Sequence, residues 1–129
     1  MARILVFDPS LPRIRKVLKE HEELALRYFW EGENEPTGTK IVWEYVNGRL
    51  PRGSSISRAT IVNFLSWMAE EGVLGYEVTT GRGGHYNLYY AKLDEKGFEK
   101  YVITVMFLSL MRDFPEATDE VFKSMMRSQ

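Results

Sequence analysis

The sequence contains no cysteine, which excludes disulfides, cysteine-based metal sites and thiol catalysis. Its two histidines, His21 and His85, are too few to form an ordinary zinc site without cysteine. Gln129 is the single glutamine, and proteins of thermophiles are depleted in such thermolabile residues. These absences favour a thermophilic source, and they predict no metal and no cofactor.

The chain also lacks a long apolar segment. Its longest mostly apolar run, residues 101–111, is far shorter than the roughly 20 residues that a membrane-spanning helix needs. The N-terminus has only a short apolar run, residues 4–7, and no small-residue cleavage pattern of the kind that ends a signal peptide. We therefore expect a cytoplasmic protein with no membrane partner.

Neither sign of charge dominates. The 17 Lys and Arg residues nearly balance the 18 Asp and Glu residues, giving a net charge of -1 and a pI near 6.1, which argues against a histone-like or purely electrostatic binder. No serine has a histidine and a carboxylate at a recognised spacing, and no paired acids lie in an apolar context. The sequence therefore predicts neither an enzyme nor a small-molecule ligand.

At 129 residues the chain can form one compact core with an appendage. Residues 4–7 are β-prone and end at Asp8-Pro9, so we expect a short strand there, followed by a helix whose first turn holds Pro12. Apolar residues at helical spacing then predict a helix from Glu22 that stops at Gly32. Residues 1–20 are an N-terminal extension in this interpretation.

Two more helices are predicted after a turn-rich connector, residues 33–39. The first covers residues 40–46, with Thr39 as N-cap and Asn47-Gly48 as its stop, and Ser57 is the expected N-cap of the second. Residues placed at about 100° intervals around this second helix separate into two faces. Its expected buried face holds Ile61, Phe64, Leu65 and Met68, and its expected outer face holds Ala59, Val62, Asn63 and Ser66. A helix that enters the DNA major groove needs side chains that are small or able to form hydrogen bonds.

A β-hairpin is predicted between residues 74 and 90. Leu74, Tyr76 and Val78 alternate with Gly75, Glu77 and Thr79, as in a half-buried strand. The glycine-rich tip, residues 80–84, carries Arg82 and leads into an aromatic return strand. Because this tip joins strand to strand, it does not fit a nucleotide-binding loop, which joins a strand to a helix. Helix followed by hairpin is the order of a winged helix-turn-helix.

The C-terminal part, residues 93–129, is predicted to form two helices. Asp94 is the expected N-cap of a long helix that extends to about Arg112 and is apolar on nearly every side. Pro115 is expected to break it, and a last helix to start at Thr118 or Asp119 with Val121, Phe122 and Met125 turned inward. A helix this apolar needs a second chain to cover it, so we expect a homodimer through Phe98, Tyr101, Val102, Val105, Met106, Leu110 and Phe122.

Three blocks of sequence resemble the penicillinase-repressor family of winged-helix regulators, which includes the methicillin-resistance and copper-responsive repressors. Trp30-Glu31-Gly32 matches the end of the family's first helix. Thr60, Ile61, Leu65 and Gly72 match the recognition-helix pattern, and residues 74–90, with Gly81-Arg82, match the wing. The resemblance covers roughly residues 21–92, and it implies a DNA-binding regulator.

The chain departs from the family in two places. Ser66-Trp67 and Glu70-Glu71 stand where the family has Asn-Arg and two lysines, which predicts weaker phosphate contacts at that end of the helix. The copper-responsive members sense metal through cysteines, so the absence of cysteine excludes that mechanism. No motif allows the cleavage-based inactivation of the penicillinase repressors to be carried over.

The sequence thus predicts an α+β, mostly α protein with a winged helix-turn-helix domain, residues 1–92, and a helical dimerisation segment, residues 93–129. The sequence between Gly38 and Met68 contains four cationic side chains and one carboxylate, a net charge of +3 (four minus one), as a phosphate-facing surface requires. We expect a homodimeric repressor that binds double-stranded DNA through Lys40, Arg49, Arg52, Ser57, Arg58, Thr60, Asn63, Ser66, Arg82 and His85. The alternative is a winged-helix protein-interaction module without specific DNA binding.

Overall fold

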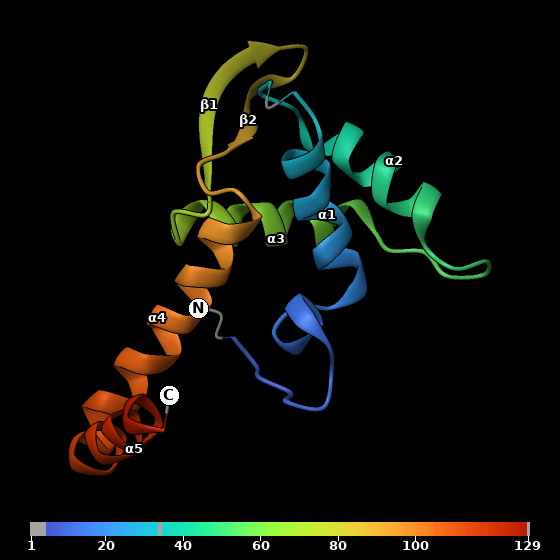
Figure 1. Ribbon diagram of the computed structural model, residues 1–129. Helices are drawn as coiled ribbons and strands as arrows, with labels where there is room; N and C mark the ends of the chain where they lie inside the picture. Colours follow the sequence, from blue (N-terminus) through green and yellow to red (C-terminus); the bar gives the residue numbers. More distant parts are fainter. Residues whose placement is uncertain (1–4, 34, 129) are drawn as a thin grey trace. The chain divides into compact units, whose positions relative to one another are not determined.

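The computed structural model describes residues 5–33 and 35–128, which are mostly helical and include one two-stranded antiparallel sheet (Figure 1). The α+β, mostly α class predicted from the sequence is therefore confirmed. The chain divides into two compact units, Met1–Glu95 and Lys96–Gln129. Within the described part of the chain, no helix is both long enough and apolar enough to cross a bilayer.

The first unit is built on three α-helices and a hairpin. These are α1 (Glu20–Glu31), α2 (Thr39–Arg49), α3 (Arg58–Glu70), β1 (Leu74–Gly81) and β2 (Gly84–Ala91). The predicted buried face of α3 is confirmed, because Ile61, Phe64, Leu65 and Met68 are all inaccessible to solvent. They belong to a core that also contains Ala25, Leu26, Phe29, Val42, Val46, Val73 and Leu74. Burying each large aliphatic side chain contributes about 1.5–3 kcal/mol, so this core holds the three helices together.

The N-terminal extension differs from its prediction. Residues 5–7 form no strand, and Val6 is 73% exposed; Ile4 lies outside the described residues. Without a neighbouring strand, so short a segment cannot satisfy its backbone hydrogen bonds as a sheet. The helix predicted at Pro12 is a single 3₁₀ segment, η1 (Arg13–Lys16), which Pro12 precedes as the N-cap.

Two predicted helix boundaries are confirmed and one pair is wrong. α1 ends at Gly32, and the Ser57 hydroxyl caps α3 by accepting from the Thr60 amide at 3.2 Å. In contrast, the N-cap of α2 is Gly38 rather than Thr39, and Asn47-Gly48 lies inside the helix instead of stopping it. Asn47 is held there because its side chain bonds to the backbone of Ile56.

The hairpin forms at the predicted place, but its strands are buried only near their base. Gly81 pairs with Gly84, which leaves Arg82 and Gly83 as the turn, and Gly83 and Gly84 have φ values of 93° and 114°. On the face predicted to be buried, Leu74 is inaccessible to solvent, but Tyr76 and Val78 are 54% and 60% exposed, so the prediction is wrong beyond the base of the strand. A two-stranded ribbon that extends past the core has nothing to cover its outer half.

The hairpin is anchored at its base by a third segment. Thr37, just before α2, exchanges two backbone hydrogen bonds of 2.8 Å with Tyr89 of β2. Both side chains are buried. This bridge fixes the start of α2 against β2.

The second unit contains most of α4 (Glu95–Asp113) and all of α5 (Pro115–Arg127). Pro115 is the first residue of α5 rather than a residue before a helix that starts at Thr118 or Asp119. Proline suits this position because the first helical amide has no intrahelical partner. The predicted inward stripe of α5 is also wrong for a single chain, since Val121, Phe122 and Met125 are between 50% and 64% exposed.

Candidate nucleic-acid interface

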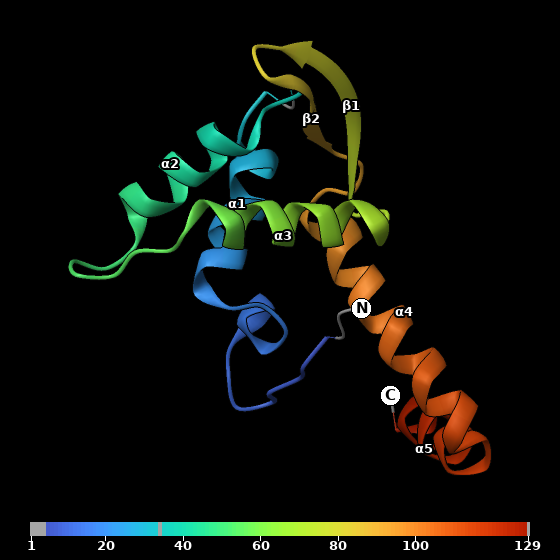
Figure 2. The ribbon, with the colours of Figure 1, turned by 180° about the vertical axis from the view of Figure 1, so that it is seen from behind.

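The outer face of α3 carries short side chains above a closed core. Ala59, Val62, Asn63 and Ser66 are all exposed, as predicted. Figure 2 shows α3 in front of α1, with the outer side of the helix open to the viewer. This face can therefore approach another molecule closely without removing any side chain from the core.

The amino end of α3 is organised by hydroxyl groups. The Ser57 and Thr60 hydroxyls lie 2.9 Å apart, and Thr60 is half-buried. Arg58 is exposed and donates to Thr39 Oγ1 at 3.5 Å, across to the start of α2. Ser57 and Thr60 thus form hydrogen bonds within the end of the helix. Of the predicted DNA contacts Ser57, Arg58 and Thr60, Arg58 is therefore the one most available to bind a phosphate.

The loop between α2 and α3 is held by α2. The Ile56 amide donates to Asn47 Oδ1 at 3.0 Å, and the Ile56 carbonyl accepts from Trp43 Nε1 at 2.8 Å and from Asn47 Nδ2 at 3.3 Å. Sequence reasoning missed this role because an Asn-Gly pair is also a common helix stop. The clamp fixes the loop that carries Arg52 directly before α3.

Three more predicted cations lie at the surface of α2 and its loop. Lys40 and Arg52 are exposed, and Arg49 is exposed with its guanidinium 3.5 Å from the centre of the Tyr45 ring. Arg49 also donates to the Tyr45 carbonyl at 3.2 Å. A guanidinium on an aromatic face keeps its charge and its remaining donors, so Arg49 is oriented yet still able to bind an anion.

Arg82 and His85 form a second, separate group on the hairpin. Both are exposed, Arg82 at the turn and His85 opposite Thr80. A Cβ atom at Gly81 would lie 2.7 Å from Tyr86 Cε1, so the Tyr86 ring packs directly on the glycine beside the turn. The structure therefore brings Lys40, Arg49, Arg52 and Arg58 around α2 and the start of α3, and puts Arg82 and His85 on the ribbon that follows its carboxyl end.

The carboxyl end of α3 is acidic. Glu70 and Glu71 are both exposed, and Trp67 beside them is buried. Charge along α3 therefore runs from Arg58 at the amino end to the two glutamates at the other. A phosphate backbone would be attracted to the first end and repelled by the second.

A group of ion pairs in the first unit joins Arg27 and Arg13 to carboxylates. Arg27 on α1 bonds Glu23 at 3.0 Å and Glu95 at 3.1 Å, and Arg13 reaches Glu95 at 3.2 Å. The hydrogen bond from Arg27 is the main cause that lowers the pKa of Glu95 below its usual 4.5. Sequence patterns gave no signal for the two bonds to Glu95, because Glu95 is far from Arg27 and Arg13 in the chain, whereas Glu23 lies one helical turn from Arg27.

The predicted dimerisation residues have mixed exposure. Phe98 is fully buried, Tyr101, Val102 and Met106 are half-buried, and Val105, Leu110 and Phe122 are exposed. Within the second unit the rings of Phe107 and Phe122 meet edge to face at 6.0 Å. Other large apolar side chains of this unit are exposed as well: Ile103, Leu108, Phe114, Val121, Met125 and Met126.

No family model, curated protein or solved structure matches this chain. Within residues 5–33 and 35–128, no three His, Cys, Asp or Glu side chains gather in a group that could hold a metal ion.

Proposed function

We propose that the first unit is a winged helix-turn-helix of the penicillinase-repressor type, and that the protein is a sequence-specific regulator, a repressor, that binds double-stranded DNA as a homodimer. The observation that carries the proposal is the outer face of α3. Its short, exposed side chains follow an amino end that carries the exposed Arg58, and the loop before it carries the exposed Arg52. In this arrangement α3 is the recognition helix, α2 precedes it in the helix-turn-helix, and the hairpin is the wing.

Asn63 is the proposed base contact. Its amide is exposed and can pair bidentately with adenine in the major groove. Arg58 and the cations of α2 and its loop are the proposed phosphate contacts, and Arg82 reaches the flanking backbone or minor groove. Because the carboxyl end of α3 is acidic, the first half of the helix enters the groove.

A dimer is part of the proposal for two reasons. The second unit exposes a set of large apolar side chains on both helices. Exposed apolar surface of this kind is typical of a face that another chain covers in an assembly. The net charge of -1 also makes one head a modest DNA binder. Two linked heads bind more tightly because the second contact is intramolecular, and a two-fold axis requires half-sites about one helical turn, or a whole multiple, apart.

Selection of bound sequences from a random duplex pool tests the proposal most directly. The expected result is an enriched motif with dyad symmetry. Binding should also weaken steeply with salt, with a slope of roughly -0.9 per neutralised phosphate. Arg58→Ala should reduce the slope by about one phosphate, whereas Lys100→Ala, which removes an exposed cation from the second unit, should leave it unchanged.

A protein-interaction module is the second candidate, favoured by the exposed Tyr76, Val78 and Tyr86 on the hairpin. Such a module would show no measurable binding to duplex DNA even at low salt. That result, together with failure to enrich any sequence, would replace the first proposal with the second.

A further inference from the structure

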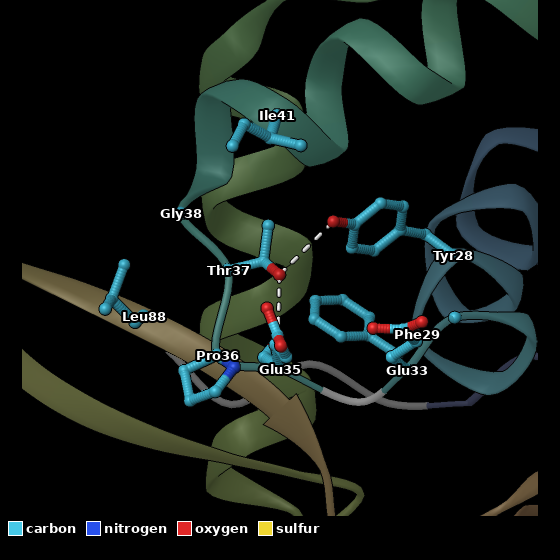
Figure 3. Close-up of a pocket in the computed structure, with 10 residues that line it drawn as sticks. Tyr28, Phe29, Glu33, Glu35, Pro36, Thr37, Gly38, Ile41 and Leu88 are labelled. Carbon is cyan, nitrogen blue, oxygen red and sulfur yellow. Dashed lines mark hydrogen bonds between the residues drawn. The ribbon is translucent and has the colours of Figure 1, made fainter.

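A pocket of about 430 Å³ opens between the carboxyl end of α1, residues 33 and 35–38 of the connector, and β2 (Figure 3). Small-molecule sites in proteins usually have volumes of about 300–1,000 Å³. The pocket belongs to the first unit, and its lining includes none of the residues proposed above to contact DNA. It is therefore a separate feature.

The walls of the pocket are mainly apolar and well supported. Figure 3 shows the rings of Tyr28 and Phe29 on one side, with Leu88 opposite and Ile41 at the α2 end. Phe29 is 3% exposed and meets the Tyr28 ring edge to face at 5.2 Å, so both rings have a fixed orientation. An aromatic or branched aliphatic group would find a preformed surface here.

The polar groups of the wall are engaged with one another. The Tyr28 hydroxyl donates to Thr37 Oγ1 at 3.2 Å, and Thr37 Oγ1 donates to the Glu35 carbonyl at 2.8 Å. These bonds fix the connector against α1. The side-chain carboxylates are therefore the groups that determine the charge of a ligand that the pocket can bind.

The charge of the pocket has one sign. Glu33 and Glu35 both line it and are exposed, and no lysine, arginine or histidine is among its described lining residues. A cation is attracted both by carboxylates and by the faces of aromatic rings. An anion would be repelled by the same groups.

We propose that this pocket binds a small organic cation, a substituted ammonium group attached to an aromatic or branched aliphatic body. The apolar body lies against Phe29 and Leu88, and the ammonium group lies near Glu33 and Glu35. Because the carboxylates are solvent-exposed, they select the sign of the ligand, and the apolar walls supply most of its affinity.

The position of the pocket makes this ligand an effector, a role that rests on the proposed DNA binding. The lining includes Gly38, the N-cap of α2, and Leu88, next to the residue that bridges to Thr37. A bound molecule therefore touches α1, the start of α2 and the hairpin at once. If the ligand and DNA favour different arrangements of these elements, each weakens the binding of the other, and the two factors are equal.

The binding test uses the full chain and benzyltrimethylammonium as the probe, followed by calorimetry and by amide chemical shifts. Shifts should gather at residues 28–41 and around Leu88, and benzenesulfonate, an anion of similar size, should not bind. Glu33→Gln combined with Glu35→Gln should weaken probe binding by roughly tenfold. Glu44→Gln removes an exposed carboxylate of α2 that does not line the pocket, and it should have no effect.

Ile41→Lys is a second variant, and it tests the site even if the two glutamine substitutions leave probe binding unchanged. Ile41 is 54% exposed, so the substitution should not unfold the protein, and a cation at the α2 end should abolish binding of the probe. Absence of probe binding at millimolar concentration, equal binding of benzenesulfonate, or probe binding unchanged in both variants would overturn the proposal.

The effector role is measured separately, by titrating the selected duplex with and without saturating probe. The expected result is a change in DNA affinity of threefold or more, which the Ile41→Lys variant no longer shows. If the probe binds but DNA affinity stays constant, the effector role is refuted and the binding site stands. If no duplex is bound at all, the proposed function fails, and the probe titration still decides whether the pocket is a cation site.

Discussion

Asn63 and Arg82 are both exposed, but they differ in what they can recognise. The Asn63 amide offers a donor and an acceptor to a base edge, whereas the Arg82 guanidinium at the hairpin turn offers charge to phosphates. We expect Asn63→Ala to change the order of preference among duplexes by about 1–3 kcal/mol at one base pair. Arg82→Ala should weaken all duplexes alike. Competition binding across single-base variants of the selected site measures both.

The two variants serve as controls for each other, since neither side chain belongs to the core. Equal thermal unfolding midpoints for both proteins and the wild type would show that folding is unaffected. If Asn63→Ala left sequence preference unchanged, the outer face of α3 would not be the reading face.

Glu95 gives the first unit a dependence on pH. Its pKa is lowered chiefly by the hydrogen bond from Arg27, so the folded protein binds this proton less tightly than the unfolded chain does. The resulting stabilisation is complete above the usual pKa of 4.5 and is lost as pH falls through the lower folded pKa. Because both side chains are partly exposed, we expect its magnitude to be about 0.5–1 kcal/mol.

Urea unfolding of Glu95→Gln and the wild type measures this contribution. The difference in unfolding free energy should be present near neutral pH and should shrink as pH falls through the lowered pKa of Glu95 in the folded protein. Glu99→Gln, an exposed carboxylate of α4, is the matched control and should show no such difference. A Glu95→Gln difference that did not shrink at low pH would mean that packing, rather than charge, explains it.

At the level of elements, Asn47 determines how α2 presents the loop that leads to α3. Asn47→Ala removes two hydrogen bonds to Ile56 and leaves the Ile56 amide without its side-chain acceptor. We expect a loss of about 1–3 kcal/mol in unfolding free energy, together with weaker DNA binding, because Arg52 and Arg58 flank the released segment. Chemical denaturation and duplex titration report the two effects.

Asn87→Ala is a suitable comparison, since Asn87 is an asparagine on the exposed hairpin. Its loss should cost less stability than the loss of Asn47. Equal effects of the two substitutions would show that the Ile56 clamp contributes nothing beyond an ordinary surface hydrogen bond.

The order of elements in the first unit could be predicted from the sequence, because the local sequence patterns agree with the way in which the elements pack. The spacing of Ile61, Phe64, Leu65 and Met68 specified the buried face of α3, and Ser57 marked where that helix begins. Gly83 and Gly84 marked the turn, since both need positive φ.

Predictions failed where distant contacts decide the outcome. The alternation around Tyr76 and Val78 is the pattern of a half-buried strand, yet no other element covers that part of the ribbon. Asn47-Gly48 has the composition of a helix stop, but Ile56, brought back by the loop, holds Asn47 in helical conformation. The bonds from Arg27 and Arg13 to Glu95 and the bridge between Thr37 and Tyr89 join residues too far apart for any local pattern to indicate.

At the scale of the whole molecule, the exposed apolar surface of the second unit leads to a test of assembly. Leu110 is 44% exposed, and the proposed dimer buries it. The wild type should sediment as a dimer at micromolar concentration, and Leu110→Glu should shift it toward monomer, because a buried unpaired carboxylate costs several kcal/mol. Lys100→Ala, on the same helix, should remain dimeric.

The same pair of proteins connects assembly to DNA binding. Monomeric Leu110→Glu should retain weak binding to a half-site and lose the gain in affinity that a complete dyad gives. A wild-type protein that sediments as a monomer at every concentration would refute the dimer and the dyad with it.

The bridge between Thr37 and Tyr89 also has a consequence for the order of folding. It joins a residue that precedes α2 to one near the end of β2, so the chain between them must already be compact before its two hydrogen bonds can form. We therefore expect this contact to be completed late in folding and lost early in unfolding. The pocket beside it, whose wall includes Thr37 and Leu88, would then be the last part of the first unit to take shape.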